Sequence, residues 1–484
     1  MADHSFNFDN TYINLPKVFY TELSPTPVRK PEMVIFNTPV AENMGLNFSG
    51  ISTQAKAMLF SGNNMPEGSR PFAQAYAGHQ FGNFTMLGDG RAIVWGEHIT
   101  PSDQRLDIQF KGSGPTPYSR GADGRAALGP MLREYIMSEA MHALNIPTTR
   151  SLAVVTNGEK IYREKALSGA ILTRVSSSHI RVGTFEYAAL QNDKIITRAL
   201  LNYTIERHYP WIKKEEGKAL SLLNAVIDKQ VDLIINWMRV GFIHGVMNTD
   251  NMTLSGETID YGPCAFMDAY DPRTVFSSID HQGRYAYGNQ PHIAQWNLAR
   301  LAEAILPLLH DECENAIDIA EEALNGFGVK YEEKWQSMMR AKLGLFDKQE
   351  GDESLITDLL VWMQRSGADY TNTFMCLTEN NLSQDKIYND SFFKEWHARW
   401  QMQLAKYVKQ SKSSLTLMRT SNPSVIPRNH KMEQVLKDAT SGDLKPLKNF
   451  LAALKTPYKN CSDLKPYQDP PSQEERVCQT FCGT

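Results

Sequence analysis

The chain has 484 residues, a formal net charge of −4 at pH 7 and 42% hydrophobic residues. This length allows about two or three regions with sizeable cores, and the lack of a basic excess argues against nucleic-acid binding. The apolar runs are far shorter than the ~20 residues of a membrane helix, and MADHSFNFDN lacks a signal-peptide pattern. We therefore expect a soluble, cytoplasmic protein with neither nucleic-acid nor membrane partners.

An irregular N-terminal extension is expected over residues 1–60, followed by a mixed α/β region to about residue 190. Alternating apolar residues and turn-forming glycines indicate the strands. The predicted strands are 34–36, 92–95, 106–111, 151–155 and 170–174, and a short helix is predicted over 39–44. A longer helix is predicted over 130–144, because apolar residues recur there at helical spacing and Pro130 suits a first helical position.

The pattern is mainly helical from 191 to 455. An apolar stripe predicts a helix over 219–239, and Gly241 ends it before a loop that runs to Asn251. Further helices are predicted over 293–310, 314–325, 331–343, 354–365, 392–409 and 431–439, with a proline-bearing interruption at 422–427. The proline-rich tail, 456–484, is predicted to be extended.

The most informative motif joins His244-Gly245, Asn251 and Asp260-Tyr261-Gly262. Protein kinases carry H-R-D-x-x-x-x-N and then D-F-G in this order. Asn251 occupies the position of the kinase metal-binding asparagine, whereas Val246 replaces the catalytic aspartate. Oxygen ligands suit a hard divalent cation, so we predict a metal at Asn251 and Asp260. Asp250 is the candidate base; the alternative is that these are ordinary turn residues.

Lys111, at the end of a predicted strand, and Glu134, on a predicted helix, precede that motif. In kinases a strand lysine is anchored by a helix glutamate so that its ammonium points at phosphates. The alternative is two unrelated surface residues. The order of lysine, glutamate and metal motif favours the paired interpretation.

Other candidate nucleotide contacts are less specific. The glycines of FGNFTMLGDGR, which include Gly88 and Gly90, would let backbone N–H groups approach phosphates beside Arg91, or would simply form a turn. Asp123 and Gly124 lie in a loop that either covers a nucleotide or is merely solvated. Two arginines, Arg174 and Arg181, could converge on one phosphate or lie on the surface.

The six cysteines are too scattered for a disulfide framework or a zinc ribbon. Cys478 and Cys482 lie four positions apart near the C-terminus and are either plain thiols on a loose end or a redox-active tail. Cys264 follows Asp-Tyr-Gly closely and could be their partner. We expect oxidation of such a pair to lower activity.

Taken together, these motifs resemble the selenoprotein O (YdiU-type) family of protein adenylyltransferases. The resemblance is carried by YAGHQFGNF (76–84), LGDGR (87–91), FKGSGPTPYSRGADGRAALG (110–129), ILTRVSSSHIRVGTFEY (171–187), HGVMNTDNM (244–252) and IDYGPCAFMDAYDP (259–272), and it spans most of the chain. It implies an α+β pseudokinase with the two-lobed protein-kinase-like fold. The mixed α/β N-lobe would be 61–190 and the mainly helical C-lobe 191–455.

The resemblance implies transfer of AMP from ATP to Ser, Thr or Tyr hydroxyls of proteins, with release of pyrophosphate. The family is thought to hold ATP flipped relative to a kinase, which fits Val246. It implies nucleotide binding by Gly88, Gly90, Arg91, Lys111, Asp123, Gly124, Arg174, Arg181 and Asp260, Mg²⁺ binding by Asn251 and Asp260, and proton acceptance by Asp250, with Glu134 orienting Lys111. Related eukaryotic proteins carry selenocysteine where this chain has Cys482.

Three other functions stay open at this point. Some bacterial members are reported to use UTP with Mn²⁺, which would make the protein a uridylyltransferase. An atypical kinase would transfer the γ-phosphate instead. A catalytically dead nucleotide sensor is the third, although such a scaffold has less need of the two metal ligands Asn251 and Asp260.

Overall fold

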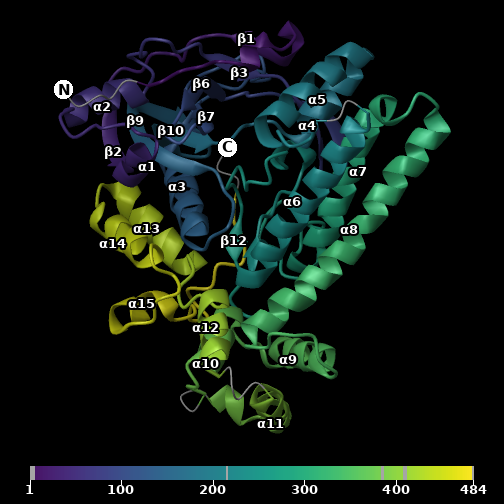
Figure 1. Cartoon of the computed structure of the whole chain (residues 1–484). Helices are drawn as coiled ribbons and strands as arrows, with labels where there is room; N and C mark the ends of the chain where they lie inside the picture. The colour runs from purple at the N-terminus through teal and green to yellow at the C-terminus, as the bar shows by residue number, and fades with distance from the viewer. Residues whose placement is uncertain (1–5, 214–215, 383–385, 407–410, 482–484) are drawn as a thin grey trace.

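The protein is described by a computed structural model that covers residues 6–213, 216–382, 386–406 and 411–481. It is a mixed α/β structure in which an antiparallel sheet lies beside a larger array of helices (Figure 1). The sheet has the strand order β1-β3-β6-β7-β10-β9-β2, and β8 pairs with β10. Its strands are β1 (Tyr20–Glu22), β2 (Glu32–Phe36), β3 (Phe72–Gln74), β6 (Ala92–Ile99), β7 (Arg105–Lys111), β8 (Ala126–Ala127), β9 (Arg150–Tyr162) and β10 (Ala166–Ser176).

Two small two-stranded sheets complete the β-structure. One is a hairpin of β4 (Ala77–Gln80) and β5 (Asn83–Met86), and the other pairs β11 (Phe242–Ile243) with β12 (Ala265–Phe266). The helices are α1 (Thr38–Asn43), α2 (Thr53–Phe60), α3 (Leu128–Ala143), α4 (Val182–Leu190), α5 (Lys194–His208), α6 (Lys218–Val240), α7 (Gln290–Leu309), α8 (Cys313–Lys342), α9 (Asp352–Ser366), α10 (Tyr370–Thr378), α11 (Ser391–Ala405), α12 (Ser411–Ser421), α13 (Asn429–Ser441), α14 (Lys445–Leu454) and α15 (Lys465–Gln468).

The two faces of the central sheet bury different residues. Side chains alternate along β7, so Ile108 and Phe110 join Trp95 in an aromatic core on one face. Gln109 and Lys111 therefore point to the other face, which α3 covers. This alternation places polar side chains beneath α3, at the edge of the helical array.

The helical array is built around α6, which is buried along most of its length. The long helices α6, α7 and α8 pack against one another and lie side by side in Figure 1. Gly241, in the left-handed region at φ 73°, ends α6 as its position predicts. None of the helices in the described ranges combines the length and apolar content needed to cross a bilayer.

Several predicted elements are confirmed within a few residues, among them strands β6 and β7 and helices α3 and α6. The two helices predicted at 314–325 and 331–343 are wrong, because α8 runs without a break from Cys313 to Lys342. Gly326 and Gly328 lie between the two predicted helices. Both lie inside the helix, where open space surrounds them, and packing against α6 and α7 keeps the helix continuous.

Three further expectations need correction. The predicted loop 241–251 contains the short strand β11 and a 3-10 helix, Thr249–Asn251. The tail predicted to be extended contains α15 and a 3-10 turn. The helix predicted over 392–409 corresponds to α11, which ends at Ala405, and residues 407–409 lie outside the described ranges.

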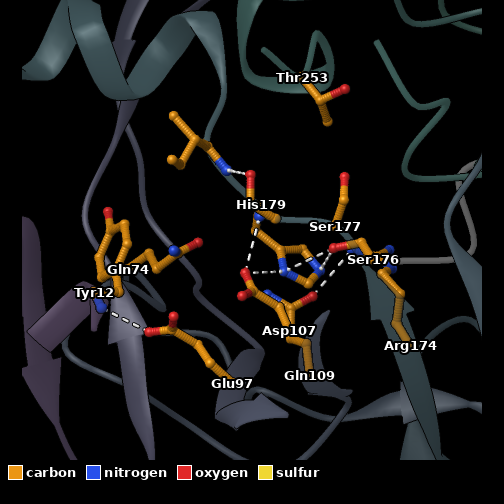
Figure 2. Close-up of polar contacts among 12 residues, drawn as sticks. Tyr12, Gln74, Glu97, Asp107, Gln109, Arg174, Ser176, Ser177, His179 and Thr253 are labelled. Atoms are coloured by element: carbon orange, nitrogen blue, oxygen red, sulfur yellow. Dashed lines mark hydrogen bonds and ion pairs between the residues drawn. The ribbon is translucent and has the colours of Figure 1, made fainter. Parts of the chain in front are cut away.

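A buried polar cluster ties the N-terminal segment, the sheet and α5 together. Figure 2 shows part of it, with the contacts of Tyr12 with Glu97 and of His179 with Asp107. Arg207 on α5 contacts Glu97 Oε2 at 2.8 Å and Asp107 Oδ1 at 2.6 Å. Asp107 Oδ2 also accepts a hydrogen bond from the backbone N–H of His179 at 3.0 Å, and Glu97 accepts one from the N–H of Tyr12 at 2.6 Å. Each buried carboxylate therefore has a cationic partner, as burial of charge requires.

We predict that Arg207→Met lowers the free energy of unfolding by about 3 kcal/mol, because it removes the cation shared by two buried carboxylates. Urea unfolding followed by circular dichroism measures this. Lys330→Met is the control, since its ion pair with Asp228 is exposed and should contribute at most about 1 kcal/mol. An equal decrease in the free energy of unfolding for both variants would contradict the stabilising role of Arg207.

Candidate active site

Alternation along two neighbouring strands aims three polar side chains at α3. β7 and β10 pair with Arg174 opposite Gln109, which brings Lys111 and Arg174 to the same face. Glu134 on α3 meets them and is only 1% exposed. Lys111 Nζ donates to Glu134 Oε2 at 2.7 Å, and Arg174 Nε donates to Glu134 Oε1 at 2.7 Å. The predicted Lys111–Glu134 pair therefore exists in the structure, and Arg174 shares its acceptor.

Asp260 lies on the cavity side of these two cations. Its Oδ1 accepts a hydrogen bond from Lys111 Nζ and lies 3.5 Å from Arg174 Nη2. Burial disfavours the ionised form, but the charges of Lys111 and Arg174, with Arg91, outweigh it and hold the pKa of Asp260 far below its usual range. Asp260 is thus ionised, as a metal-binding carboxylate must be.

The loop that carries Asn251 is held by buried backbone contacts. His244 Nε2 lies 2.9 Å from the carbonyl oxygen of Ile259. This contact links the His244-Gly245 pair to the Asp260-Tyr261-Gly262 segment. Asn251 Nδ2 donates to the carbonyl oxygen of Val246 at 3.0 Å. Since its nitrogen is used in this way, the side-chain oxygen of Asn251 is the atom left for a cation.

Asp250 lies beside Asn251 beneath the β4–β5 hairpin. Its Oδ2 accepts a hydrogen bond from Gln80 Nε2 at 3.4 Å, whereas Oδ1 is buried with no hydrogen-bond partner in the described part of the chain. Burial raises the pKa of Asp250 to about 7, against the opposing charge of Arg181. An unpaired carboxylate oxygen with such a pKa is suited to accept a proton near neutral pH.

Arg181 and Asp89 form the opposite wall. The Arg181 guanidinium stacks over the Tyr76 ring, 4.2 Å from its centroid, and its Nη2 lies 3.6 Å from Asp89 Oδ1. Asp89 Oδ2 also accepts a hydrogen bond from Gln109 Nε2 at 3.3 Å. Because the side-chain oxygen of Gln109 accepts from Arg174 at 3.0 Å, Asp89 and Gln109 connect the two predicted arginines.

Glycines line the cavity where no side chain fits. A Cβ on Gly88 would lie 2.4 Å from the Tyr118 ring, and one on Gly124 would lie 2.1 Å from the carbonyl oxygen of Gly114. Asp123, next to Gly124, accepts two hydrogen bonds from Arg163, both at 2.9 Å, and this contact lowers its pKa. The loop therefore combines a packed residue, Gly124, with the ion pair of Asp123, while Gly121, Ala122 and Asp123 stay exposed.

These residues surround one cavity of about 520 Å³, a volume within the range of small-molecule sites. The predicted residues that line it are Gly88, Gly90, Arg91, Lys111, Asp123, Gly124, Arg174, Arg181, Asp250, Asn251 and Asp260. Glu134 is not part of its lining but contacts Lys111 from behind. Val246, in the place of the kinase base, lines it as well.

Several residues that line the cavity were not predicted from the sequence. Tyr76, Gln80, Asp89, Tyr118 and Asn248 all face the cavity. The motif YAGHQFGNF contained the first two, but nothing in its spacing indicated that it would meet Asp250. The position of Asp89 between Gly88 and Gly90 was the only available signal for that residue.

The predicted redox cysteines lie elsewhere. Cys264 is fully buried, and burial raises the pKa of its thiol to about 12. Cys478 is exposed, and both are free thiols. Cys482 lies outside the described residues. The tail nevertheless comes close, because Thr480 Oγ1 donates to the carbonyl oxygen of Pro263, the neighbour of Cys264.

Comparison with known proteins identifies the family. The family model described as "Protein adenylyltransferase SelO" matches residues 3–455. The chain belongs to the SelO family. It is 59% identical over 483 residues to the "Protein nucleotidyltransferase YdiU" of Nitrosococcus oceani, covering 100% of this chain and 98% of the relative. Proteins of the same name from Bacillus thuringiensis and Bacillus cereus are 56% identical over 480 residues, covering 99% of this chain and 98% of each relative. This SelO-family protein is accordingly an enzyme, a protein nucleotidyltransferase, with a nucleotide and a protein as its substrates.

We predict that Gly124→Ala weakens nucleotide binding at least tenfold, about 1.4 kcal/mol, because the new Cβ would displace the backbone at Gly114. Calorimetric titration with ATP and Mg²⁺ measures the affinity. Gly121→Ala is the matched control: it lies in the same loop at φ +84° but meets nothing within 4 Å, so it carries only backbone strain. Equal affinities for the two variants would contradict the prediction.

Proposed function

We propose that this protein transfers AMP from ATP to Ser, Thr or Tyr hydroxyls of proteins and releases pyrophosphate. The carrying observation is a single cavity that joins cationic side chains, the oxygen ligands Asn251 and Asp260, and the unpaired carboxylate of Asp250, while the kinase base position holds Val246. We place it in a two-lobed kinase-like fold with an N-lobe over 61–190 and a C-lobe over 191–455. Residues 1–60 would be an extension and 456–484 a tail.

In this proposal Lys111, Arg174, Arg181 and Arg91 bind the phosphates. Glu134 holds Lys111 and Arg174 in fixed rotamers, so little conformational entropy is lost when the nucleotide arrives. Gly88, Gly90 and Gly124 allow close backbone approach, and Asp123 with its partner Arg163 covers the far end of the nucleotide.

Asp250 would act as the base. The acceptor hydroxyl oxygen forms a bond to the α-phosphorus, the bond from that phosphorus to the β-phosphate bridging oxygen breaks, and the hydroxyl proton passes to Asp250 Oδ1. Arg181 and Lys111 stabilise the negative charge on the phosphates as the reaction proceeds. An acceptor placed beside Asp250 needs no carboxylate at position 246.

Asn251 and Asp260 would hold Mg²⁺ or Mn²⁺. The fit rests on the donors: Asp260 is ionised, Lys111 and Arg174 contact only its Oδ1 among the described contacts, and the side-chain oxygen of Asn251 is not used in the hydrogen bond to Val246. In the described part of the chain no three His, Cys, Asp or Glu side chains cluster as a metal site, so phosphate oxygens and water would supply the other ligands. A bound ion would supply positive charge that offsets the negative charge of the nucleotide phosphates.

Radiolabelled ATP tests the function. We expect α-label, and no γ-label, to enter an acceptor protein, and Asp250→Asn to lower the rate by about 10²- to 10⁴-fold while ATP still binds. EDTA should abolish transfer. Parallel reactions with α-labelled UTP and Mn²⁺ distinguish uridylyl transfer. Label arriving only from the γ-position would identify a kinase instead, and no transfer of any label would identify a nucleotide-binding scaffold.

We further propose that a disulfide between a C-terminal cysteine, Cys478 or Cys482, and Cys264 lowers the transfer rate. The Thr480–Pro263 hydrogen bond brings the tail close, although the raised pKa of Cys264 makes its oxidation slow. Oxidised glutathione would accept the two electrons and two protons. We expect it to slow the wild-type protein and to leave Cys264→Ser unaffected; equal rates for wild type with and without oxidant would contradict the proposal.

A further inference from the structure

The β4–β5 hairpin has one open edge beside the active site. Its two-residue turn, Phe81-Gly82, has φ values of 51° and 84°, as in the type I′ turns that suit hairpins. β4 packs against α4 and the Thr249–Asn251 turn, whereas β5 pairs only with β4 among the described strands. The outer edge of β5 is therefore free to accept another strand.

The hairpin is fixed to the loop that carries the proposed base. The backbone N–H of His79 donates to Thr249 Oγ1 at 2.7 Å, and that of Phe81 donates to Asn248 Oδ1 at 3.1 Å. A Cβ on Gly78 would lie 2.7 Å from Asp250 Oδ1. The open edge thus has a set position relative to Asp250.

The open strand has two partly exposed apolar side chains, and the ring of one of them, Phe84, packs edge-on against His79 with centroids 5.2 Å apart. Phe84 is 43% exposed and Met86 is 51% exposed, and their spacing places both on one face. Adjacent to the turn, Gln80 and Asn83 form the hydrogen-bonded pair of a two-residue hairpin, so the backbone groups of Phe84 point outward. Proteins usually protect such an edge with charge, proline or a covering element, and β5 has none of these.

A cation lies next to the turn. The Arg284 guanidinium carbon is 3.7 Å from the position of a Cβ on Gly82 and stacks over Trp296 at 4.7 Å. No carboxylate of the described residues forms an ion pair with Arg284, and its Nε is buried without a hydrogen-bond partner. This end of the hairpin is therefore suited to an acidic group from another molecule.

We propose that the acceptor protein docks as an extended segment along β5, with an acidic side chain near Arg284. This inference rests on the proposed function. Side chains of the added strand would point alternately to the two faces of the hairpin. One set would contact Phe84 and Met86. The other set would lie on the face of Gly78 and Gln80, where Asp250 also lies. The alternation thus presents a hydroxyl to the base while the apolar face and the edge hydrogen bonds hold the segment.

Steady-state transfer of α-label from ATP to synthetic peptides tests the docking. The peptides carry one tyrosine or serine flanked by aspartates or by lysines. We expect Phe84→Ser/Met86→Ser to raise the KM for peptide at least tenfold with ATP affinity unchanged, and Arg284→Glu to reverse the preference for acidic over basic flanks. Ile195→Ser, at a residue that is 76% exposed on α5, is the control and should behave as wild type.

Unchanged peptide KM in the double variant, or an unchanged flank preference in Arg284→Glu, would overturn the proposal. A loss of self-association by light scattering, with peptide KM intact, would assign the edge to a second copy of the chain and would also overturn it. Wild type that transfers no α-label would be a failure of the proposed function itself, a result distinct from these. The thermal midpoint of each variant shows that it is folded.

Discussion

The carboxylate of Glu134 is the interaction on which the site depends. It binds Lys111 through one oxygen and Arg174 through the other, at 2.7 Å each. Two cations in a buried place repel each other and are costly to desolvate. Glu134 offsets both costs, and the burial that would raise its own pKa is outweighed by these two cations, which lower it. Asp260 adds a second carboxylate on the cavity side. The two cations and two carboxylates together are therefore close to neutral in the absence of a nucleotide.

The cavity requires parts of the chain that are distant in sequence. The sheet supplies Lys111 and Arg174, α3 supplies Glu134, and the loops after β11 supply Asn251 and Asp260. The polar cluster, part of which Figure 2 shows, extends this framework through Asp107, which connects to His179. Asp107 also pairs with Arg207, and Gln109 on the same strand connects Arg174 to Asp89. Arg174 and Arg181 are thus connected by buried hydrogen bonds through Gln109 and Asp89 and by the ion pair between Asp89 and Arg181.

The sequence was sufficient to predict the candidate site residues that follow one another in the same order as the motifs of a protein kinase. Lys111, Glu134, Asn251 and Asp260 follow the order of a known arrangement, and all four were predicted. Asp89 was missed because its role depends on Gln109 and Arg181, which only the fold brings near it. The two helices predicted in place of α8 failed for a related reason: helix propensity at Gly326 is local, whereas the packing that overrides it is tertiary.

The pairing of β2 with β9 sets an order of events during synthesis. Glu32 lies opposite Thr156, so the first of these strands leaves the ribosome long before its partner exists. At about 5–20 residues per second the delay is on the order of ten seconds. Throughout that interval β2 lacks its partner strand, and an unpaired apolar strand is a template for pairing with other chain segments.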